Sequence, residues 1–326
     1  MNWFKNTIIY FLLTVCGLTM IVPFIWMVGV SLRSQLEVNQ GASGFNPVVK
    51  YQSYNYQGTD YQISVVMPQK DSTVINLLDK NSKIVKSYLK VPSSQIREVK
   101  KLQFHWSNYI DAFKKVPFDT YFFNTIYMAI LVLIGVLFTS ALSAYAFARM
   151  HFKGKDFTFY FLISMMMIPE PVFIIPSYVL LNKLGWINTY NALIIPWIAN
   201  IFTIFLMRQH FKTIPQDLLD AASIDGCSMF KILYKIILPL SKSVIATASV
   251  FSIIGSWNSF MWPLVMTNSP ELRVLQVGLS YFSQEASSQT TLLMAASSFS
   301  IIPLVIIFLF AQRSIIESYS SSGMKE

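Results

Sequence analysis

The sequence predicts an all-α membrane protein with six transmembrane helices. Hydrophobic residues make up 54% of the chain and charged residues only 13%, whereas a soluble domain carries about a quarter charged residues. The chain also contains six long apolar runs, each close to the roughly 20 residues that a helix needs to cross a bilayer. These runs lie at 7–32, 121–147, 157–181, 190–211, 243–266 and 291–311.

The first run, with Lys5 ahead of it, has some features of a signal peptide. It is too long for the apolar core of one, which spans about 7–15 residues, and no A-x-A-like cleavage site follows. We therefore expect residues 1–33 to form an N-terminal transmembrane helix. Cys16 lies in this run and Cys227 in a later polar loop, so the two cysteines should lie at different depths and should not form a disulfide.

Residues 34–117 form a long polar segment before the second run. Strand character is evident at 63–67 and 73–75, and 94–101 is compatible with a helix. Two interpretations stay open for this segment, a small extracytoplasmic subdomain and a partly ordered insertion. The remaining runs are grouped as a five-helix core at 118–313, followed by a polar tail at 314–326.

Six spans place both termini on the same side of the membrane. The positive-inside rule assigns the side from the short loops, because long loops translocate largely regardless of charge. With cytoplasmic termini, the short outer segments contain chiefly Lys183 and Arg273. The short inner segments then contain Lys5, Arg149, Lys153, Lys155, Arg208, Lys212, Lys231, Lys235, Lys242, Arg313 and Lys325. We therefore expect both termini to lie in the cytoplasm. The net charge of +9 does not indicate nucleic-acid binding, since the basic residues are scattered between spans.

A loop at 212–242, here called the central loop, separates the fourth and fifth runs and should face the cytoplasm. Thr213 and Gln216 have the spacing of a capping box at the start of a short helix. Asp225-Gly226 should end that helix, because Gly adopts the left-handed conformation that a helix C-terminus needs. Ser228 can cap a second helix, and Pro239 should close or kink it. The pattern predicts two short helices, although an amphipathic loop lying on the membrane surface fits as well.

Two intramembrane features are candidates for a substrate path. Glu170 lies between Pro169 and Pro171, and an ionisable residue within a span indicates a functional site by default, unless a water-filled vestibule merely solvates it. In the fifth run, serines recur at helical spacing on one face, next to an aromatic and an amide side chain. Such a face suits a sugar, whose hydroxyls need hydrogen bonds and whose ring faces stack on aromatics. The alternative is that the small serines allow close packing of helices. The serines of the sixth run fit packing better. The candidate residues are Glu170, Ser252, Ser256, Trp257, Asn258 and Ser259.

No catalytic constellation and no metal site are predicted. The three histidines lie in different segments without metal-ligand spacing. The phosphate-binding loop G-x-x-x-x-G-K-[ST] does not occur, so we expect this chain to bind no nucleotide by that means.

The central loop resembles that of the membrane subunits of binding-protein-dependent ABC importers. That family has E-A-A, two residues, D-G-A and then I-x-L-P, and this chain has Asp220-Ala221-Ala222, then Asp225-Gly226, then Ile236-x-Leu238-Pro239. Asp220 replaces the usual Glu, which shortens the reach of that carboxylate, and Cys227 replaces the usual Ala. Ser143-Ala144-Tyr145-Ala146-Phe147-Ala148-Arg149 and Trp257-Asn258-x-Phe260-x-Trp262-Pro263-Leu264 are similar to carbohydrate permeases. The resemblance covers about 108–325 and is nearest to the second membrane subunit of maltose-type importers.

This resemblance implies a type I ABC importer permease fold and a role in moving a carbohydrate, such as an oligosaccharide, by alternating access. It implies as partners a homologous second permease, an ATPase dimer that binds the ATP and Mg, and an extracytoplasmic solute-binding protein. The chain itself would be a transport subunit and not an enzyme, with no bound cofactor. The residues to which the resemblance assigns coupling to the ATPase are Asp217, Asp220, Ala221, Ala222, Asp225 and Gly226.

Two other functions are compatible with a polytopic membrane protein. An ion- or proton-coupled secondary transporter would use Glu170 as its coupling carboxylate, but inverted repeats are not evident in the sequence. A membrane-anchored scaffold whose long loop binds a partner would leave the central loop unexplained.

Overall fold

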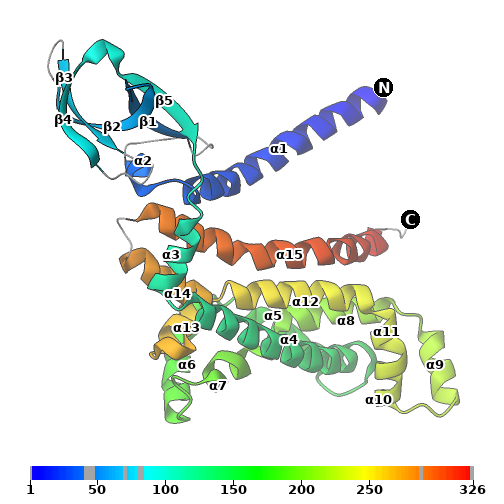
Figure 1. Cartoon of the computed structure of the whole chain (residues 1–326). Coiled ribbons are helices and arrows are strands. Elements are labelled where there is room, and N and C mark those ends of the chain that lie inside the picture. The colour runs from blue at the N-terminus through cyan, green and yellow to red at the C-terminus, as the bar shows by residue number, and fades with distance from the viewer. Residues whose placement is uncertain (1, 40–47, 69–71, 79–83, 286–288, 324–326) are drawn as a thin grey trace. The chain divides into compact units, whose positions relative to one another are not determined.

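The computed structural model describes residues 2–39, 48–68, 72–78, 84–285 and 289–323. The chain forms two compact units (Figure 1). The first unit comprises Met1–Ala112 and Ala286–Ser298, and the second comprises Phe113–Glu285 and Phe299–Glu326. The N-terminal helix and the polar segment after it thus group together, which divides the chain differently from the predicted boundaries at 33 and 117.

The first unit begins with the apolar helix α1 (Asn2–Ser31), followed by the short α2 (Gln35–Asn39). Residues Lys5–Ser31 of α1 are long and apolar enough to span a membrane. The end of α1 is fixed by Asn108 at the start of α3 (Ser107–Lys115), whose side-chain amide donates to the carbonyl oxygens of Ser31 and Arg33, both at 2.7 Å.

The polar segment after α2 contains a five-stranded antiparallel sheet with strand order β4-β3-β2-β1-β5. Its core consists of Ile63, Ile75, Leu77 and Val91. The expected strands at 63–67 and 73–75 are confirmed within β2 and β3. The strands are β1 (Val48–Tyr56), β2 (Thr59–Pro68), β3 (Ser72–Leu78), β4 (Ile84–Pro92) and β5 (Arg97–Leu102).

The helix expected at 94–101 is wrong. Only Ser93–Gln95 form a 3₁₀ turn, and the chain then continues as β5, which pairs with β1 from Val48 to Ser53. Pairing with a strand that lies more than 40 residues away in the sequence overrides the weak local helix preference.

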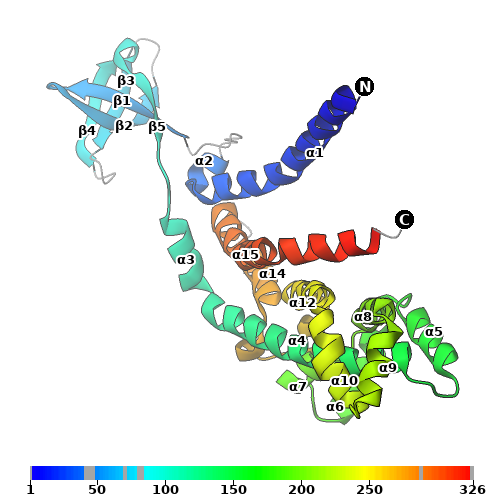
Figure 2. The same cartoon turned by 90° about the vertical axis from the view of Figure 1, so that its right-hand side faces the viewer.

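The second unit is helical and is arranged around the long helix α4 (Phe118–Arg149). Figures 1 and 2 show α4 beside α8 (Ile201–Thr213) and α12 (Lys242–Trp257), and these helices pack against one another. The other elements before the central loop are α5 (Lys155–Met165), α6 (Glu170–Lys183), α7 (Tyr190–Ile194) and the 3₁₀ turn Ile195–Trp197. After α12 come α13 (Met261–Met266), the 3₁₀ turn Pro270–Leu272, α14 (Leu275–Glu285) and α15 (Thr290–Gly323). The residues of α15 up to Ser298 belong to the first unit.

Within the described residues, four helical stretches are each long and apolar enough to span a membrane: Lys5–Ser31, Phe118–Arg149, Tyr190–Thr213 and Thr290–Gln312. Two further pairs qualify only as bent spans. Lys155–Met165 and Glu170–Lys183 meet at 102°, and Met229–Leu240 and Lys242–Trp257 meet at 82°. The six predicted spans are reached only if each bent pair counts as one. The first bend lies just before Pro169, because a proline disfavours the helical conformation of the residue that precedes it.

Close packing of side chains against glycines fixes α4 against its neighbours. A Cβ added at Gly278 in α14 would lie 2.1 Å from Cδ2 of Tyr121, and one added at Gly135 would lie 2.5 Å from Cγ2 of Ile198. The side-chain amide of Asn124 also donates to the carbonyl oxygens of Glu271 and Arg273, at 2.6 and 3.0 Å. Packing therefore requires glycine at positions 135 and 278. Together with the Asn124 hydrogen bonds, these contacts hold α4 tightly against its neighbours.

Candidate functional site

The central loop folds into a group of short helices at one end of α4, α8 and α12 (Figure 1). These are α9 (Gln216–Ile224) and α10 (Met229–Ile232), then a π-helical turn at Leu233–Ile237 and α11 (Leu238–Leu240). The predicted pair of short helices is thus present, and the second continues through the π turn to the bend before α12.

The turn between α9 and α10 is built as the sequence predicts. Gly226 has a φ of +75°, in the left-handed region, and its amide donates to the carbonyl oxygen of Ser223 at 3.1 Å. The Ser228 hydroxyl accepts from the amide of Lys231 at 3.4 Å and caps α10. The break at Asp225-Gly226 and the cap at Ser228 are confirmed.

The capping box at Thr213 is wrong. Helix α8 continues through Thr213, whose hydroxyl donates to the carbonyl oxygen of His210 at 2.8 Å, one turn earlier in that helix. Gln216 begins α9 and does not return to Thr213, because its side-chain amide donates to Asp220 at 2.9 Å. Its oxygen accepts from Arg149. The start of α9 is therefore fixed partly by a residue outside the local sequence, Arg149.

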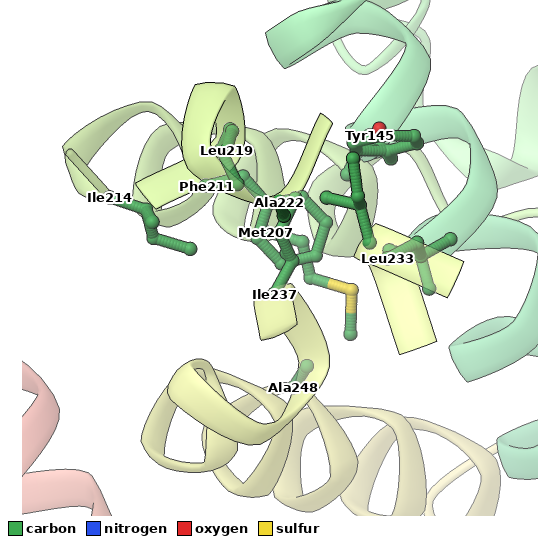
Figure 3. Packing of buried hydrophobic residues seen from close by; sticks show 12 residues of the cluster. Tyr145, Met207, Phe211, Ile214, Leu219, Ala222, Leu233, Ile237 and Ala248 are labelled. Atoms are coloured by element: carbon green, nitrogen blue, oxygen red, sulfur yellow. The ribbon is translucent and has the colours of Figure 1, made fainter. Parts of the chain in front are cut away.

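One face of the central loop is buried against the helix bundle (Figure 3). Leu219 and Ala222, three residues apart on α9, are buried in a cluster with Phe211 and Met207 of α8 and Ile237 of the π turn. The cluster also includes residues of α4 and α12, among them Tyr145 and Ala248. Burial of several such side chains at about 1.5–3 kcal/mol each holds the loop firmly on the bundle.

The opposite face is exposed and carries both apolar and acidic side chains. Ile224 is 86% exposed and Phe230 is 75% exposed. The exposed large apolar residues of the loop are Leu218, Ile224, Met229, Phe230, Tyr234 and Leu240. All the residues predicted to couple to an ATPase except Ala222 are exposed, namely Asp217, Asp220, Ala221, Asp225 and Gly226. A group of large apolar side chains that are exposed on one short segment is typical of a protein–protein interface.

Two arginines connect the ends of α4 and α8 reciprocally. Arg149, the last residue of α4, donates from Nε and Nη2 to the carbonyl oxygen of Phe211 at 3.1 and 2.6 Å. Its guanidinium also donates to the carbonyl oxygen of Ile214 and, at 2.8 Å, to Gln216. In the opposite direction, Arg208 of α8 donates from Nε to the carbonyl oxygen of Phe147 in α4 at 3.0 Å. Cations at helix C-termini satisfy carbonyl groups that have no partner within the helix, so Arg149 fixes both the end of α8 and the start of α9.

A cavity of about 510 Å³ lies between α4, the start of α6, α8 and the end of α12. Five of the six candidate substrate-path residues line it: Glu170, Ser252, Ser256, Asn258 and Ser259. The sixth, Trp257, does not. Its buried indole donates to the carbonyl oxygen of Ser300 at 3.0 Å and its ring contacts Phe122 edge-on. Trp257 therefore fixes α12 against α15 within this unit, while the serine face points to the cavity.

Three further polar residues line the cavity that the sequence analysis did not select: Trp197, Asn200 and Thr203. Asn200 caps α8, with its side-chain oxygen accepting from the amide of Thr203 at 2.9 Å, and this capping pattern could have been read from the sequence. The indole nitrogen of Trp197 and the hydroxyl of Ser252 are buried and have no hydrogen-bond partner among the described residues. Buried polar groups are normally satisfied, so these two atoms leave hydrogen-bonding capacity unused in the wall of the cavity.

Comparison with known proteins supports a transport function. Residues 137–320, more than half of the chain, match the family described as binding-protein-dependent transport system inner membrane component. The chain belongs to this family. The match includes the central loop and the cavity-lining residues of every element except α4, whose lining residues Met128, Val132 and Val136 precede it, and it leaves out the sheet β1–β5.

Relatives of this permease carry related descriptions. It is 35% identical to the arabinooligosaccharides transport system permease protein AraQ of Halalkalibacterium halodurans, over 63% of this chain and 74% of the relative. It is 31% identical to the probable ABC transporter permease protein YurM of Bacillus subtilis, over 68% of this chain and 74% of the relative. The sequence-based assignment to an ABC importer permease is thus confirmed, and the secondary-transporter alternative is disfavoured.

The fold has a counterpart among solved structures. A chain of a bacterial ABC transporter that imports the acidic polysaccharide alginate superposes with a TM-score of 0.69, covering 95% of the permease and 96% of that chain at 21% identity. At this identity the likeness concerns the fold alone, and it confirms the type I importer permease fold.

Proposed function

We propose that the permease is the subunit of an ATP-driven importer that receives the movement of a separate ATPase through its central loop. The observation that carries this proposal is the two-sided structure of the loop. Its inner face is buried against α4, α8 and α12, while its outer face presents Ile224, Phe230 and three exposed aspartates. A rigid element that is fixed on one side and unpartnered on the other suits the transfer of force between subunits.

Alternating access follows from this arrangement. ATP binding closes the partner ATPase dimer and displaces the central loop. Because α9 is held by the buried cluster and by Arg149, the ends of α4 and α8 move with it. The bundle then rocks around the cavity, which opens to the outside, and hydrolysis resets it. ATP and Mg are bound by the partner, and this chain acts as a transport subunit without catalytic residues or a cofactor of its own.

The proposed solute is a carbohydrate. The cavity presents hydroxyls and amides from Ser252, Ser256 and Asn258 together with the indole of Trp197, and sugars need hydrogen-bond partners for their hydroxyls and aromatic faces for their rings. Glu170 is the one ionisable residue that lines the cavity among the described residues. Its carboxyl group can also form a hydrogen bond with a sugar hydroxyl, so we favour an oligosaccharide. The name of the AraQ relative supports an oligosaccharide.

The remaining parts of the proposal concern partners and orientation. The permease pairs with a homologous second permease, and an extracytoplasmic solute-binding protein delivers the solute. A second solved structure, of a bacterial alginate ABC transporter in complex with an alginate pentasaccharide-bound periplasmic protein, has a chain that matches 63% of the permease with a TM-score of 0.51 and supports this part of the proposal. Both termini and the central loop lie in the cytoplasm, in agreement with the distribution of basic residues in the short loops.

A pull-down tests this proposal. The chain carries a C-terminal tag and is purified from membranes in mild detergent, and the proteins recovered with it are identified by mass spectrometry. We expect a P-loop ATPase and a second permease to co-purify, and Asp220→Lys to lose the ATPase while keeping the permease. Asp111→Lys, a charge reversal at another exposed aspartate outside the central loop, is the matched control and should keep both. Recovery of the chain alone, with solute uptake that follows a proton gradient and stops in Glu170→Gln, would overturn the importer proposal.

A further inference from the structure

A second pocket of about 510 Å³ lies apart from the solute cavity, where the short basic loop after α4 meets α5 and the end of α8. Lys155, Arg208 and Lys212 line it together with one carboxylate, that of Asp156. Three cations and one anion leave a surplus of two positive charges. The pocket also lies at the N-terminus of the 11-residue helix α5, where unpaired backbone amides add partial positive charge.

Arg208 is the buried cation of this pocket. Its side chain is buried, with 7% exposed, and its guanidinium lies 3.7 Å from the centroid of the Phe159 ring. The nearest carboxylate oxygen, that of Asp156, is 3.9 Å away, and the Asp156 side chain is 76% exposed. A buried charge normally has a close partner of opposite sign, so this long contact with a solvated carboxylate leaves Arg208 incompletely neutralised.

The other two cations differ in their contacts. Lys155 donates to the carbonyl oxygen of Met150 at 2.9 Å and thereby closes the loop after α4. Lys212 is exposed and has no hydrogen bond or ion pair with any described residue. Lys212 is therefore free to bind an anion that enters the pocket beside Arg208.

An aromatic face of α5 extends from this pocket. Phe157 lines the pocket and is 78% exposed, and Tyr160 and Phe161 follow at three- and four-residue steps with 68% and 57% exposed. The rings of Phe157 and Phe161 lie nearly parallel, with centroids 6.5 Å apart. A cationic pocket that continues into an exposed apolar helix face suits a molecule with an anionic head and hydrocarbon tails.

We propose that this pocket binds the phosphodiester head of an anionic phospholipid, with an acyl chain along Phe157, Tyr160 and Phe161. Basic pockets next to membrane spans on the cytoplasmic side are known to bind such heads. The same cations would attract free phosphate, but the aromatic face favours the lipid. A bound lipid would brace α5 against α8, close to the end of α8 that Arg149 and the central loop share.

Native mass spectrometry of the intact transporter complex, titrated with dioleoylphosphatidylglycerol, tests the proposal. We expect retained phosphatidylglycerol adducts, weaker adducts with dioleoylphosphatidylcholine, and little competition from inorganic phosphate. Lys212→Gln should weaken phosphatidylglycerol binding about fivefold, as expected for one basic residue at a lipid head. Asp156→Asn should strengthen it, an effect that misfolding cannot produce.

Lys153→Gln is the matched control, because Lys153 is an exposed cation of the same loop that does not line the pocket. It should change the affinity less than twofold. Equal binding of the two lipids, or equal effects of Lys212→Gln and Lys153→Gln, would overturn the proposal in favour of general surface charge. If inorganic phosphate at a similar concentration displaced the lipid, the lipid proposal would be overturned and the pocket would be a site for free phosphate.

Discussion

Replacing Arg149 with alanine should loosen the central loop without unfolding the bundle. The substitution removes the donors to the carbonyl oxygens of Phe211 and Ile214 and to the side chain of Gln216. One hydrogen bond to a charged group contributes about 1.5–3 kcal/mol. Because Arg149 is only partly buried, water replaces part of these contacts, and we expect about 1.5–3 kcal/mol for the whole set. Each 1.4 kcal/mol changes a population tenfold, so local opening of α9 should rise about 10- to 150-fold.

Hydrogen exchange of the assembled complex measures this opening directly. The amides of Gln216–Ile224 should exchange faster in Arg149→Ala by a factor in that range, while those in the middle of α4 stay protected. Arg149→Lys keeps the charge but cannot reach three acceptors with one ammonium group. The exchange rate of the α9 amides in this variant should therefore lie between those of wild type and Arg149→Ala. The amount of solute taken up per ATP hydrolysed should be highest in wild type, lower in Arg149→Lys and lowest in Arg149→Ala.

Lys153→Ala is the control, since Lys153 is exposed in the loop that follows α4. If the α9 amides of Arg149→Ala exchange at wild-type rates and uptake stays normal, Arg149 does not anchor the loop. If exchange increases uniformly throughout the bundle, the contact supports general stability, and the explanation through the central loop is wrong.

Two glycine substitutions test the backbone and the packing separately. Gly226→Val should reduce ATP-driven uptake in proteoliposomes, because a φ of +75° costs an L-residue about 1–2 kcal/mol, or more when the residue is β-branched. Gly226→Asn should keep more of the uptake activity. Uptake at the wild-type rate by Gly226→Val would contradict this prediction. Gly278→Ala should lower the thermal unfolding midpoint by the equivalent of about 1–3 kcal/mol of overpacking against Tyr121. Gly17→Ala is the control: a Cβ added at Gly17 has no atom within 4 Å, so this substitution should leave the unfolding midpoint unchanged.

The features that the sequence predicted well depend on local chemistry. The break at Asp225-Gly226 and the cap at Ser228 each follow from the conformation or the side chain of the residue concerned. Ser252 and Ser256 line the cavity because helical periodicity places them on one face of α12, whereas Ser259 lines it from beyond the end of that helix. The same periodicity explains Trp257: as the neighbour of Ser256 it points about 100° away and into the contact with Phe122 and Ser300.

The features that the sequence analysis missed depend on distant partners. Gln216 had the correct spacing for a capping box, but Arg149, 67 residues earlier, binds its side chain. Residues 97–102 form a strand because β1 is available to pair with them. Trp197 and Asn200 became visible as cavity residues only when α8 was placed beside α12. Each of these outcomes requires knowledge of which segments meet in space.

The reciprocal arginine contacts also bear on how such a contact could be detected without a structure. Arg149 and Arg208 bind the carbonyl oxygens of Phe211 and Phe147, and every amino acid supplies a carbonyl oxygen. Substitution of either phenylalanine would leave the hydrogen bond intact and would require no compensating change at the arginine. The paired positions should therefore show little covariation among homologous sequences, and methods that infer contacts from covariation would overlook the junction that joins α4 to α8.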